Sequence, residues 1–308
     1  MLLTHFLLVA LGALGLYAGG EFLVRNASRL ARATGMSPLV VGLTVVAFGT
    51  SSPELATTLT AAVEGSPGAA LGNVVGSNIA NLGLVLGLAA MLYPLRTCVR
   101  FLRREVPFMI GTGVLLVFLL ANDALGRLAG LFLILLLGAY LWALLRGGAA
   151  ETEEAHDGGS GPIGFSLGGV TIGVVLLVAG AYALVDGALD LARALEVPEQ
   201  VIGLSLVAVG GSLPELGGTL VAAFRRHGGI VLGNLIGSNV FNVLFVLGTT
   251  VLVRPLSVSP GAFTVDLLVM LGLSLLALPL FLTGRRLGRR EGAVLLGVYL
   301  AYVGFLYG

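Results

Sequence analysis

The chain repeats one long apolar pattern at an offset of 161 residues. VVGLTVVAFGTSSPELATTLTAA, which begins at residue 40, aligns with VIGLSLVAVGGSLPELGGTLVAA, which begins at residue 201. Between residues 40–87 and 201–248, 25 of 48 positions are identical without a gap. So many identities at a single offset, without a gap, do not arise by chance. The pattern therefore indicates an internal duplication and a fold built from two similar halves.

The composition places both halves in a lipid bilayer. Hydrophobic residues make up 57% of the chain and charged residues only 11%, with a mean hydropathy of +1.02, whereas soluble domains carry about 25% charged residues. The net charge of +1 implies no nucleic-acid partner, and no obligate protein partner is evident. The single cysteine, Cys98, excludes an internal disulfide and a cysteine-rich metal site.

Ten segments contain the roughly 20 apolar residues that a spanning helix needs. They lie at about 3–31, 38–63, 68–94, 103–121, 125–146, 163–193, 199–224, 229–253, 262–283 and 290–307. Because each repeat has an odd number of helices, the second repeat must enter the membrane from the opposite side. The predicted fold is an all-α integral membrane protein whose ten transmembrane helices form two inverted five-helix repeats.

Three regions follow from this division. Residues 1–146 form the first repeat, residues 147–162 an acidic, Gly-rich cytoplasmic linker, and residues 163–308 the second, inverted repeat. With both termini outside, 14 of the 17 arginines lie at inner helix ends and 3 at outer ends, as the positive-inside rule requires. We therefore expect a multi-pass protein of the inner (plasma) membrane with its N- and C-termini outside.

A polar turn interrupts the second helix of each repeat. GTSSPE (residues 49–54) aligns with GGSLPE (residues 210–215). A proline inside a helix removes a hydrogen bond, and the preceding glycines loosen the turn, so we expect local unwinding with exposed carbonyls. The carboxylates of Glu54 and Glu215 follow directly, at a depth where an uncompensated charge is costly.

A bound cation or proton is the predicted counter-charge for these carboxylates. The chain has no lysine, and no arginine lies at midplane depth in the helices that carry the glutamates. Carboxylate, carbonyl, hydroxyl and amide oxygens suit a hard cation such as Ca²⁺. The three histidines lie at helix ends or in the linker, which disfavours a zinc site.

The third helix of each repeat adds further oxygens on one face. GNVVGSNIAN and GNLIGSNVFN place Ser77 with Asn81, and Ser238 with Asn242, four residues apart. The threonines beyond Glu54 are expected to bond only to their own helix. They are Thr57, Thr58 and Thr60.

The paired motifs GTSSPEL…GNVVGSNIAN and GGSLPEL…GNLIGSNVFN resemble the signature repeats of the sodium/calcium exchangers, in the cation/calcium antiporter superfamily. The resemblance implies ten helices in two inverted repeats and exchange of Na⁺ for Ca²⁺ by alternating access at a midplane site. It implies Ca²⁺ ligands at Glu54 and Glu215, with the carbonyls of Thr50 and Gly211. It implies Na⁺ ligands at the carbonyls of Ala47 and Ala208, the hydroxyls of Ser51, Ser77, Ser212 and Ser238, and the amides of Asn81 and Asn242.

Two positions depart from the family pattern, and they leave alternatives open. Gly211 lacks the hydroxyl that Thr50 has in the first repeat, and Asn242 stands where some prokaryotic relatives carry an aspartate. A Ca²⁺/H⁺ antiporter on the same scaffold is the main alternative. A cation channel is disfavoured because the acidic pair lies within one chain. An enzyme is disfavoured because no His or Lys base shares the depth of the serines. No cofactor is expected; Ca²⁺, Na⁺ and possibly H⁺ are substrates.

Overall fold

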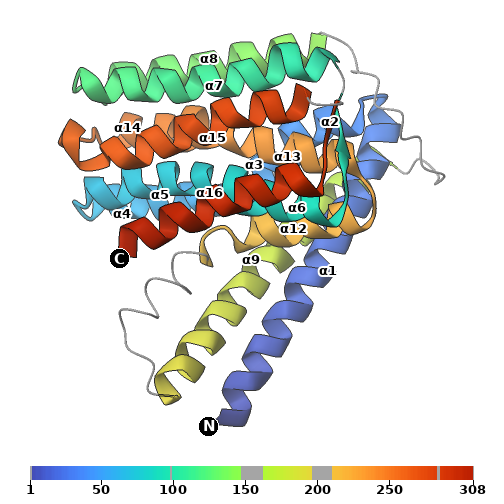
Figure 1. Cartoon of the computed structure of the whole chain (residues 1–308). Coiled ribbons are helices and arrows are strands. Elements are labelled where there is room, and N and C mark those ends of the chain that lie inside the picture. Colours follow the sequence, from blue (N-terminus) through green and yellow to red (C-terminus); the bar gives the residue numbers. More distant parts are fainter. Residues whose placement is uncertain (1, 98, 147–161, 196–209, 283–284, 308) are drawn as a thin grey trace.

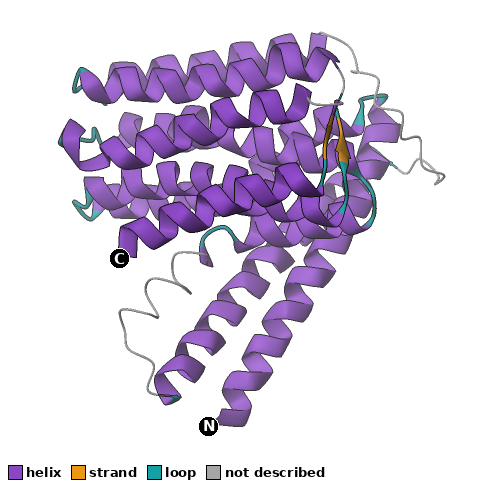
Figure 2. Ribbon diagram, viewed as in Figure 1, coloured by secondary structure: helices purple, strands orange, loops and turns teal. Residues whose placement is uncertain are grey.

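Helices form nearly all of the described structure (Figures 1 and 2). The computed structural model describes residues 2–97, 99–146, 162–195, 210–282 and 285–307. The first half contains α1 (Leu2–Thr34), α2 (Pro38–Val41), α3 (Ala47–Thr50), α4 (Ser52–Val63), α5 (Pro67–Ala80), α6 (Leu86–Leu92), α7 (Val99–Ala121) and α8 (Arg127–Arg146). The second half contains α9 (Ile163–Ala194), α12 (Leu213–Phe224), α13 (Gly228–Phe241), α14 (Gly248–Val253), α15 (Thr264–Leu282) and α16 (Arg289–Tyr307).

Short irregular elements complete this arrangement. π-helical turns lie at Gly42–Val46, Asn81–Val85 and Asn242–Leu247, and a 3₁₀ turn lies at Pro260–Phe263. β1 (Leu95–Arg96) pairs antiparallel with β2 (Arg286–Leu287). The prediction of a purely helical chain did not include this two-residue ladder, which joins the loops before α7 and α16.

The helices confirm the prediction of an all-helical membrane protein. Among the described residues, seven helical runs are long and apolar enough to span a bilayer, and the bent pair Pro38–Thr50 and Ser52–Val63 is an eighth. The other two predicted spans correspond to α16 and to α12. Helix α12 is the described part of the predicted span 199–224, whose start lies outside the described residues.

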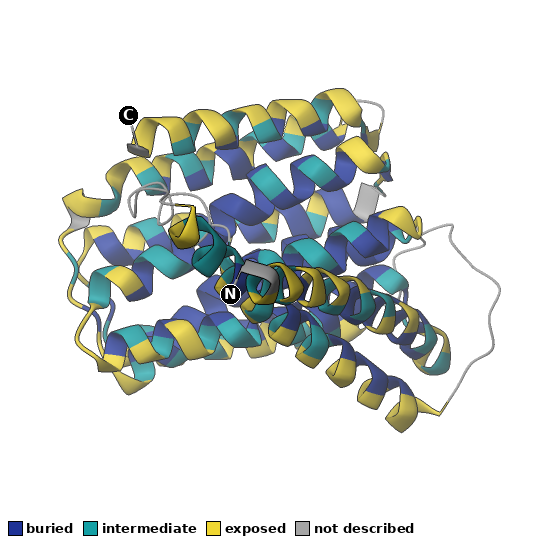
Figure 3. Cartoon of the chain, turned by 90° about the horizontal axis from the view of Figure 1, so that it is seen from below, coloured by how far each residue is buried: buried dark blue, intermediate teal, exposed yellow. Residues whose placement is uncertain are grey.

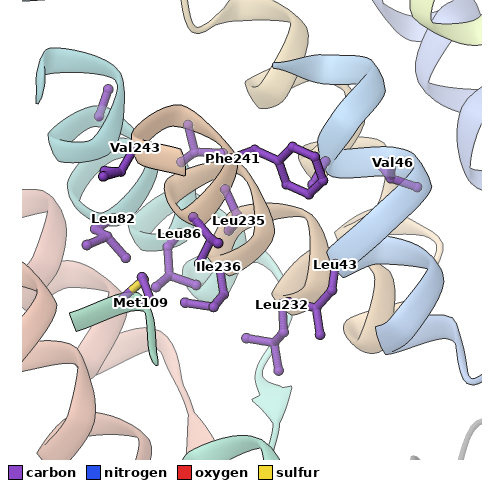
Figure 4. Close-up of a cluster of buried hydrophobic side chains, with 14 of the residues drawn as sticks. Leu43, Val46, Leu82, Leu86, Met109, Leu232, Leu235, Ile236, Phe241 and Val243 are labelled. Carbon is purple, nitrogen blue, oxygen red and sulfur yellow. The ribbon is translucent and has the colours of Figure 1, made fainter. Parts of the chain in front are cut away.

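Buried residues gather in the middle of the helix bundle (Figure 3), and two helical runs are the most buried. Within the most apolar 18-residue window of each run, 94% of α13–α14 and 83% of α5–α6 is buried inside the protein. The corresponding shares are 28% for α1 and 33% for α9. Figure 4 shows Leu232, Leu235 and Ile236 of α13 packed among side chains from both halves. Those neighbours include Leu43, Leu82, Leu86 and Met109. The helices that carry the GNVVGSNIAN and GNLIGSNVFN motifs are therefore the most buried of the seven long runs.

Helices α1 and α9 form a separate antiparallel pair that extends away from this centre (Figure 1). A methyl group placed on Gly19 would lie 2.6 Å from the backbone nitrogen of Leu177 and 2.8 Å from the carbonyl of Gly173. One placed on Gly180 would lie 2.6 Å from the nitrogen of Leu16 and 2.8 Å from the carbonyl of Gly12. The two sets of contacts are equivalent, because adding 161 to Gly19 gives Gly180. In the same way, Leu16 and Gly12 correspond to Leu177 and Gly173. Equivalent helices thus run in opposite directions, as inverted repeats require.

Candidate ion-binding site

The second span of the first repeat breaks at Ser51. The segments Pro38–Thr50 and Ser52–Val63 meet at a bend of 41°. Pro53 lies in the first turn of α4, where its missing N–H is tolerated but where the preceding helix cannot continue straight. The predicted interruption at GTSSPE is therefore present.

The aligned turn of the second repeat begins a helix in the same way. Helix α12 starts at Leu213 with Pro214 in its first turn, and Ser212 is its N-terminal cap residue. Glu54 and Glu215 each occupy the first turn of their helix. A helix N-terminus carries partial positive charge, so both carboxylates lie where anionic side chains are favoured.

The two carboxylates meet in the interior. Glu54 is 4% exposed and Glu215 is fully buried. Each carboxyl group lies close enough to the other to alter its electrostatics, and the Thr50 hydroxyl lies near Glu215. Among the described residues, none of the four carboxylate oxygens has a hydrogen-bond partner. Burying two carboxylates without hydrogen-bond donors costs free energy unless a cation or a proton neutralises them.

Neutral oxygens with unused capacity surround this pair. Within the described chain, Ser51 Oγ, both side-chain polar atoms of Asn81 and Asn242 Oδ1 are buried without a hydrogen-bond partner. Thr50 Oγ1 donates to Asn234 Oδ1 (3.1 Å) and lies 3.4 Å from Ser238 Oγ. Asn242 Nδ2 donates to Asn78 Oδ1 (3.1 Å). The elements around both glutamates therefore supply hydroxyl and amide oxygens beside the two carboxylates.

Eleven of the twelve predicted ligands lie in the described residues, and Ala208 lies outside them. Ten of the eleven are buried, whereas Gly211 is exposed. The ten are Ala47, Thr50, Ser51, Glu54, Ser77, Asn81, Ser212, Glu215, Ser238 and Asn242. The carbonyl of Ala47 already accepts the Ser51 N–H at 2.9 Å and lies 3.5 Å from Thr50 Oγ1, so an ion there would compete with the Thr50 hydroxyl for its second lone pair.

Two features of the site have no clear signal in the sequence. First, a π-helical turn begins at Asn81 and another begins at Asn242. Such turns disturb the regular i to i−4 bonding and often occur at functional sites. They occupy the same position in each repeat and begin at the asparagine that ends the Ser-Asn face.

Second, matching hydrogen bonds join neighbouring helices in each repeat. Asn73 Nδ2 donates to Thr58 Oγ1 (2.9 Å), and Asn234 Nδ2 donates to Thr219 Oγ1 (3.2 Å). The expectation that Thr58 bonds only to its own helix is wrong, because Asn73 of α5 reaches it. Thr57 does bond its own helix, donating to Pro53 O (3.1 Å).

A cavity of about 370 Å³ reaches the site from one side. Glu54, Asn73 and Gly211 line it, together with Tyr182 and Val185 of α9. This part of α9 packs beside the first turns of α1, since Gly12 lies against Leu184. The cavity thus lies on the side of the site that faces the N-terminal half of α1.

The donor set fits a hard cation. Ca²⁺ takes about six to eight oxygen ligands in flexible geometry. The described residues contain no cluster of three or more His, Cys, Asp or Glu side chains. Two carboxylates alone cannot complete such a shell, so hydroxyl, amide and carbonyl oxygens would have to supply the remaining ligands.

Comparison with known proteins agrees with this chemistry. The model of the family described as "Sodium/calcium exchanger protein" matches residues 4–146 and 165–308. Sodium/calcium exchanger MaX1 of Methanosarcina acetivorans is 35% identical over 356 residues, covering 100% of this chain and 99% of MaX1. Inner membrane protein YrbG of Escherichia coli is 35% identical over 323 residues, covering 100% of this chain and 98% of YrbG.

The fold agrees as well. The solved structure of the sodium-calcium exchanger NCX_Mj, soaked with 10 mM Na⁺ and no Ca²⁺, matches with a TM-score of 0.85 at 34% sequence identity. The match covers 99% of this chain and 100% of that one. The chain belongs to the sodium/calcium exchanger family and is a multi-pass membrane cation antiporter, not an enzyme.

Proposed function

We propose that the chain exchanges Na⁺ for Ca²⁺ by alternating access at the site between Glu54 and Glu215. The observation that carries this proposal is the pair of buried carboxylates whose four oxygens lack hydrogen-bond partners among the described residues. Ca²⁺ binds between the two glutamates, and Na⁺ ions use overlapping oxygens, so full occupancy by one excludes full occupancy by the other.

The charge balance supports obligatory exchange. Two carboxylates neutralise one Ca²⁺, and an empty site leaves two bare charges at midplane depth, which opposes reorientation. Three Na⁺ would leave one net positive charge, and moving it across the membrane changes the free energy by about 2.3 kcal/mol per 100 mV. A three-for-one exchange is therefore sensitive to voltage.

The proposed arrangement in the membrane follows the arginine distribution. Residues 1–146 and 163–308 are the two inverted repeats, and residues 147–162 are the cytoplasmic linker. Both termini lie outside an inner (plasma) membrane, as the excess of arginines at the opposite helix ends supports. In this orientation the cavity that reaches Glu54 lies on the outer side of the site.

Calcium flux into proteoliposomes tests the proposal. Glu54→Gln and Glu215→Gln should each reduce Na⁺-gradient-driven uptake of radioactive Ca²⁺ by at least about a hundredfold, because each removes a buried charged ligand. Glu64→Gln is the matched control, since Glu64 is exposed at the end of α4, and it should transport normally. Normal uptake by either site variant would overturn the proposal.

Ca²⁺/H⁺ antiport is the second candidate, favoured by Gly211, which lacks the hydroxyl of Thr50. The same vesicles distinguish the two. Exchange of Na⁺ requires uptake to follow a Na⁺ gradient at constant pH. Uptake that follows a pH gradient in the absence of Na⁺, with the same dependence on both glutamates, would assign proton coupling instead.

A further inference from the structure

Two asparagines occupy equivalent positions in the two repeats but form different hydrogen bonds. Asn78 of α5 and Asn239 of α13 are related by the 161-residue offset of the repeats, and they are 3% and 2% exposed. Neither belongs to the predicted ligand set. A buried amide needs hydrogen-bond partners, and the partners of these two amides differ in a way that bears on the ion site.

The orientation of the Asn78 amide follows from its neighbours. Asn78 Nδ2 lies 3.4 Å from the carbonyl oxygen of Asn239 and 3.8 Å from Met270 Sδ. Both of these atoms can only accept a hydrogen bond, so the nitrogen of Asn78 must face them, and not its oxygen. Asn78 Oδ1 is therefore the atom that faces Asn242, and it needs a donor there.

The orientation of Asn78 in turn fixes that of Asn242. Asn242 Nδ2 donates to Asn78 Oδ1 at 3.1 Å, and the reversed amide would place two acceptor oxygens against each other. Asn242 Oδ1 is left fully buried, without a hydrogen-bond partner among the described residues. A chain of polar groups that starts at the Asn239 carbonyl and passes through Asn78 thus ends in one free oxygen.

That free oxygen belongs to a side chain of the ion site. Asn242 lies four residues after Ser238, whose Oγ is 3.4 Å from Thr50 Oγ1. The π-helical turn that begins at Asn242 packs against α4, the helix of Glu54. A cation binds an amide through its oxygen and is repelled by its N–H groups, so the direction of this amide decides whether Asn242 can be a ligand.

The counterpart residues form no such chain in the described structure. Asn239 Nδ2 donates back to Leu235 O of its own helix at 2.7 Å. In this part of the chain, Asn239 Oδ1 and both side-chain polar atoms of Asn81 have no hydrogen-bond partner. Asn81, the counterpart of Asn242, can therefore present either end of its amide, whereas Asn242 is held in one direction.

We propose that Asn78 is a positioning residue that holds the side-chain oxygen of Asn242 towards a bound Na⁺ ion. This role rests on the proposed exchange of Na⁺ for Ca²⁺. Asn78 does not touch the ion; it removes the free-energy cost of orienting the Asn242 amide when the ion binds. Ca²⁺ depends less on this amide, because its double charge is attracted more strongly by the two glutamates.

Ion-dependent thermal stability of the full-length protein in detergent tests this role without transport. A ligand that binds only the folded state raises the unfolding temperature, so titrations with Na⁺ alone and with Ca²⁺ alone, at constant ionic strength, give the two affinities. Asn78→Ala should weaken Na⁺ binding by roughly fivefold, about one hydrogen bond, and Ca²⁺ binding by less. Asn78→Leu, which keeps most of the side-chain volume, should do the same. Asn239→Ala is the matched control, since it removes the equivalent buried asparagine, and its Na⁺ affinity should be unchanged.

Asn242→Asp separates positioning from structural support. A carboxylate presents an oxygen in either orientation, so it needs no partner to turn it. Asn78→Ala should therefore weaken Na⁺ binding in the wild type but not in the Asn242→Asp background. Equal weakening in both backgrounds would mean structural support only and would overturn the proposal, as would an unchanged Na⁺ affinity in Asn78→Ala. A wild-type protein that Ca²⁺ stabilises and Na⁺ does not would overturn the proposed function together with this role.

Discussion

Gly211 is the position at which the two halves of the ion site differ most. Its counterpart Thr50 donates to Asn234 Oδ1 at 3.1 Å. A methyl group on Gly211 would meet only Asn73 Oδ1, at 4.0 Å. The second repeat therefore has the space and the matching asparagine for a hydroxyl that it lacks.

Restoring that hydroxyl should strengthen Na⁺ binding. Gly211→Thr should lower the Na⁺ concentration for half-maximal Ca²⁺ uptake by roughly fivefold, the equivalent of about 1 kcal/mol for one added oxygen contact. The reverse change, Thr50→Gly, should raise that concentration. Measuring uptake against Na⁺ concentration in vesicles decides the matter, and an unchanged Na⁺ dependence in both variants would show that neither hydroxyl contributes.

At the scale of elements, the paired Thr–Asn hydrogen bonds hold the second and third spans of each repeat together. Thr58 joins α4 to α5, and Thr219 joins α12 to α13. The second pair is the more enclosed, because Asn234 is 1% exposed whereas Asn73 faces the cavity. Water in the cavity can replace the partner of Asn73 but not that of Asn234.

This difference predicts unequal costs for the same substitution. Thr219→Val should lower the free energy of unfolding by about 1 kcal/mol, and Thr58→Val by less, as measured by thermal unfolding in detergent. Thr171→Val provides the control, since that exposed hydroxyl donates only to Leu167 O of its own helix. A larger loss for Thr58→Val than for Thr219→Val would contradict this account.

The sequence predicts the elements well where an element repeats, and less well where it depends on tertiary contacts. The duplicated motifs were sufficient to locate both glutamates, both prolines and the antiparallel relation of the halves. The π-helical turns at Asn81 and Asn242 leave the apolar pattern unchanged, so no periodicity reveals them. The hydrogen bond from Asn73 to Thr58 joins two different helices. Predicting it requires the distance between those helices, which the sequence alone does not provide.

At the scale of the whole molecule, the contact between α1 and α9 brings together equivalent surfaces of the two repeats. The symmetric glycines Gly19 and Gly180 allow backbone to touch backbone, with no side chain between them. Small residues at such a contact let two membrane helices approach closely and associate through their backbones. Under the proposed alternating-access mechanism, the α1–α9 pair is therefore suited to move as a unit against the central helices.

The symmetry of this contact makes a quantitative prediction. Gly19→Ala and Gly180→Ala each place a methyl group 2.6 Å from a backbone nitrogen of the partner helix, and separating the helices costs about 1–3 kcal/mol. The two variants should therefore show similar losses of thermal stability and of Ca²⁺ flux. Gly138→Ala, where a methyl group meets nothing within 4 Å, should show neither loss. A strong effect of one interface variant without the other would mean that the repeats do not share this contact equally during transport.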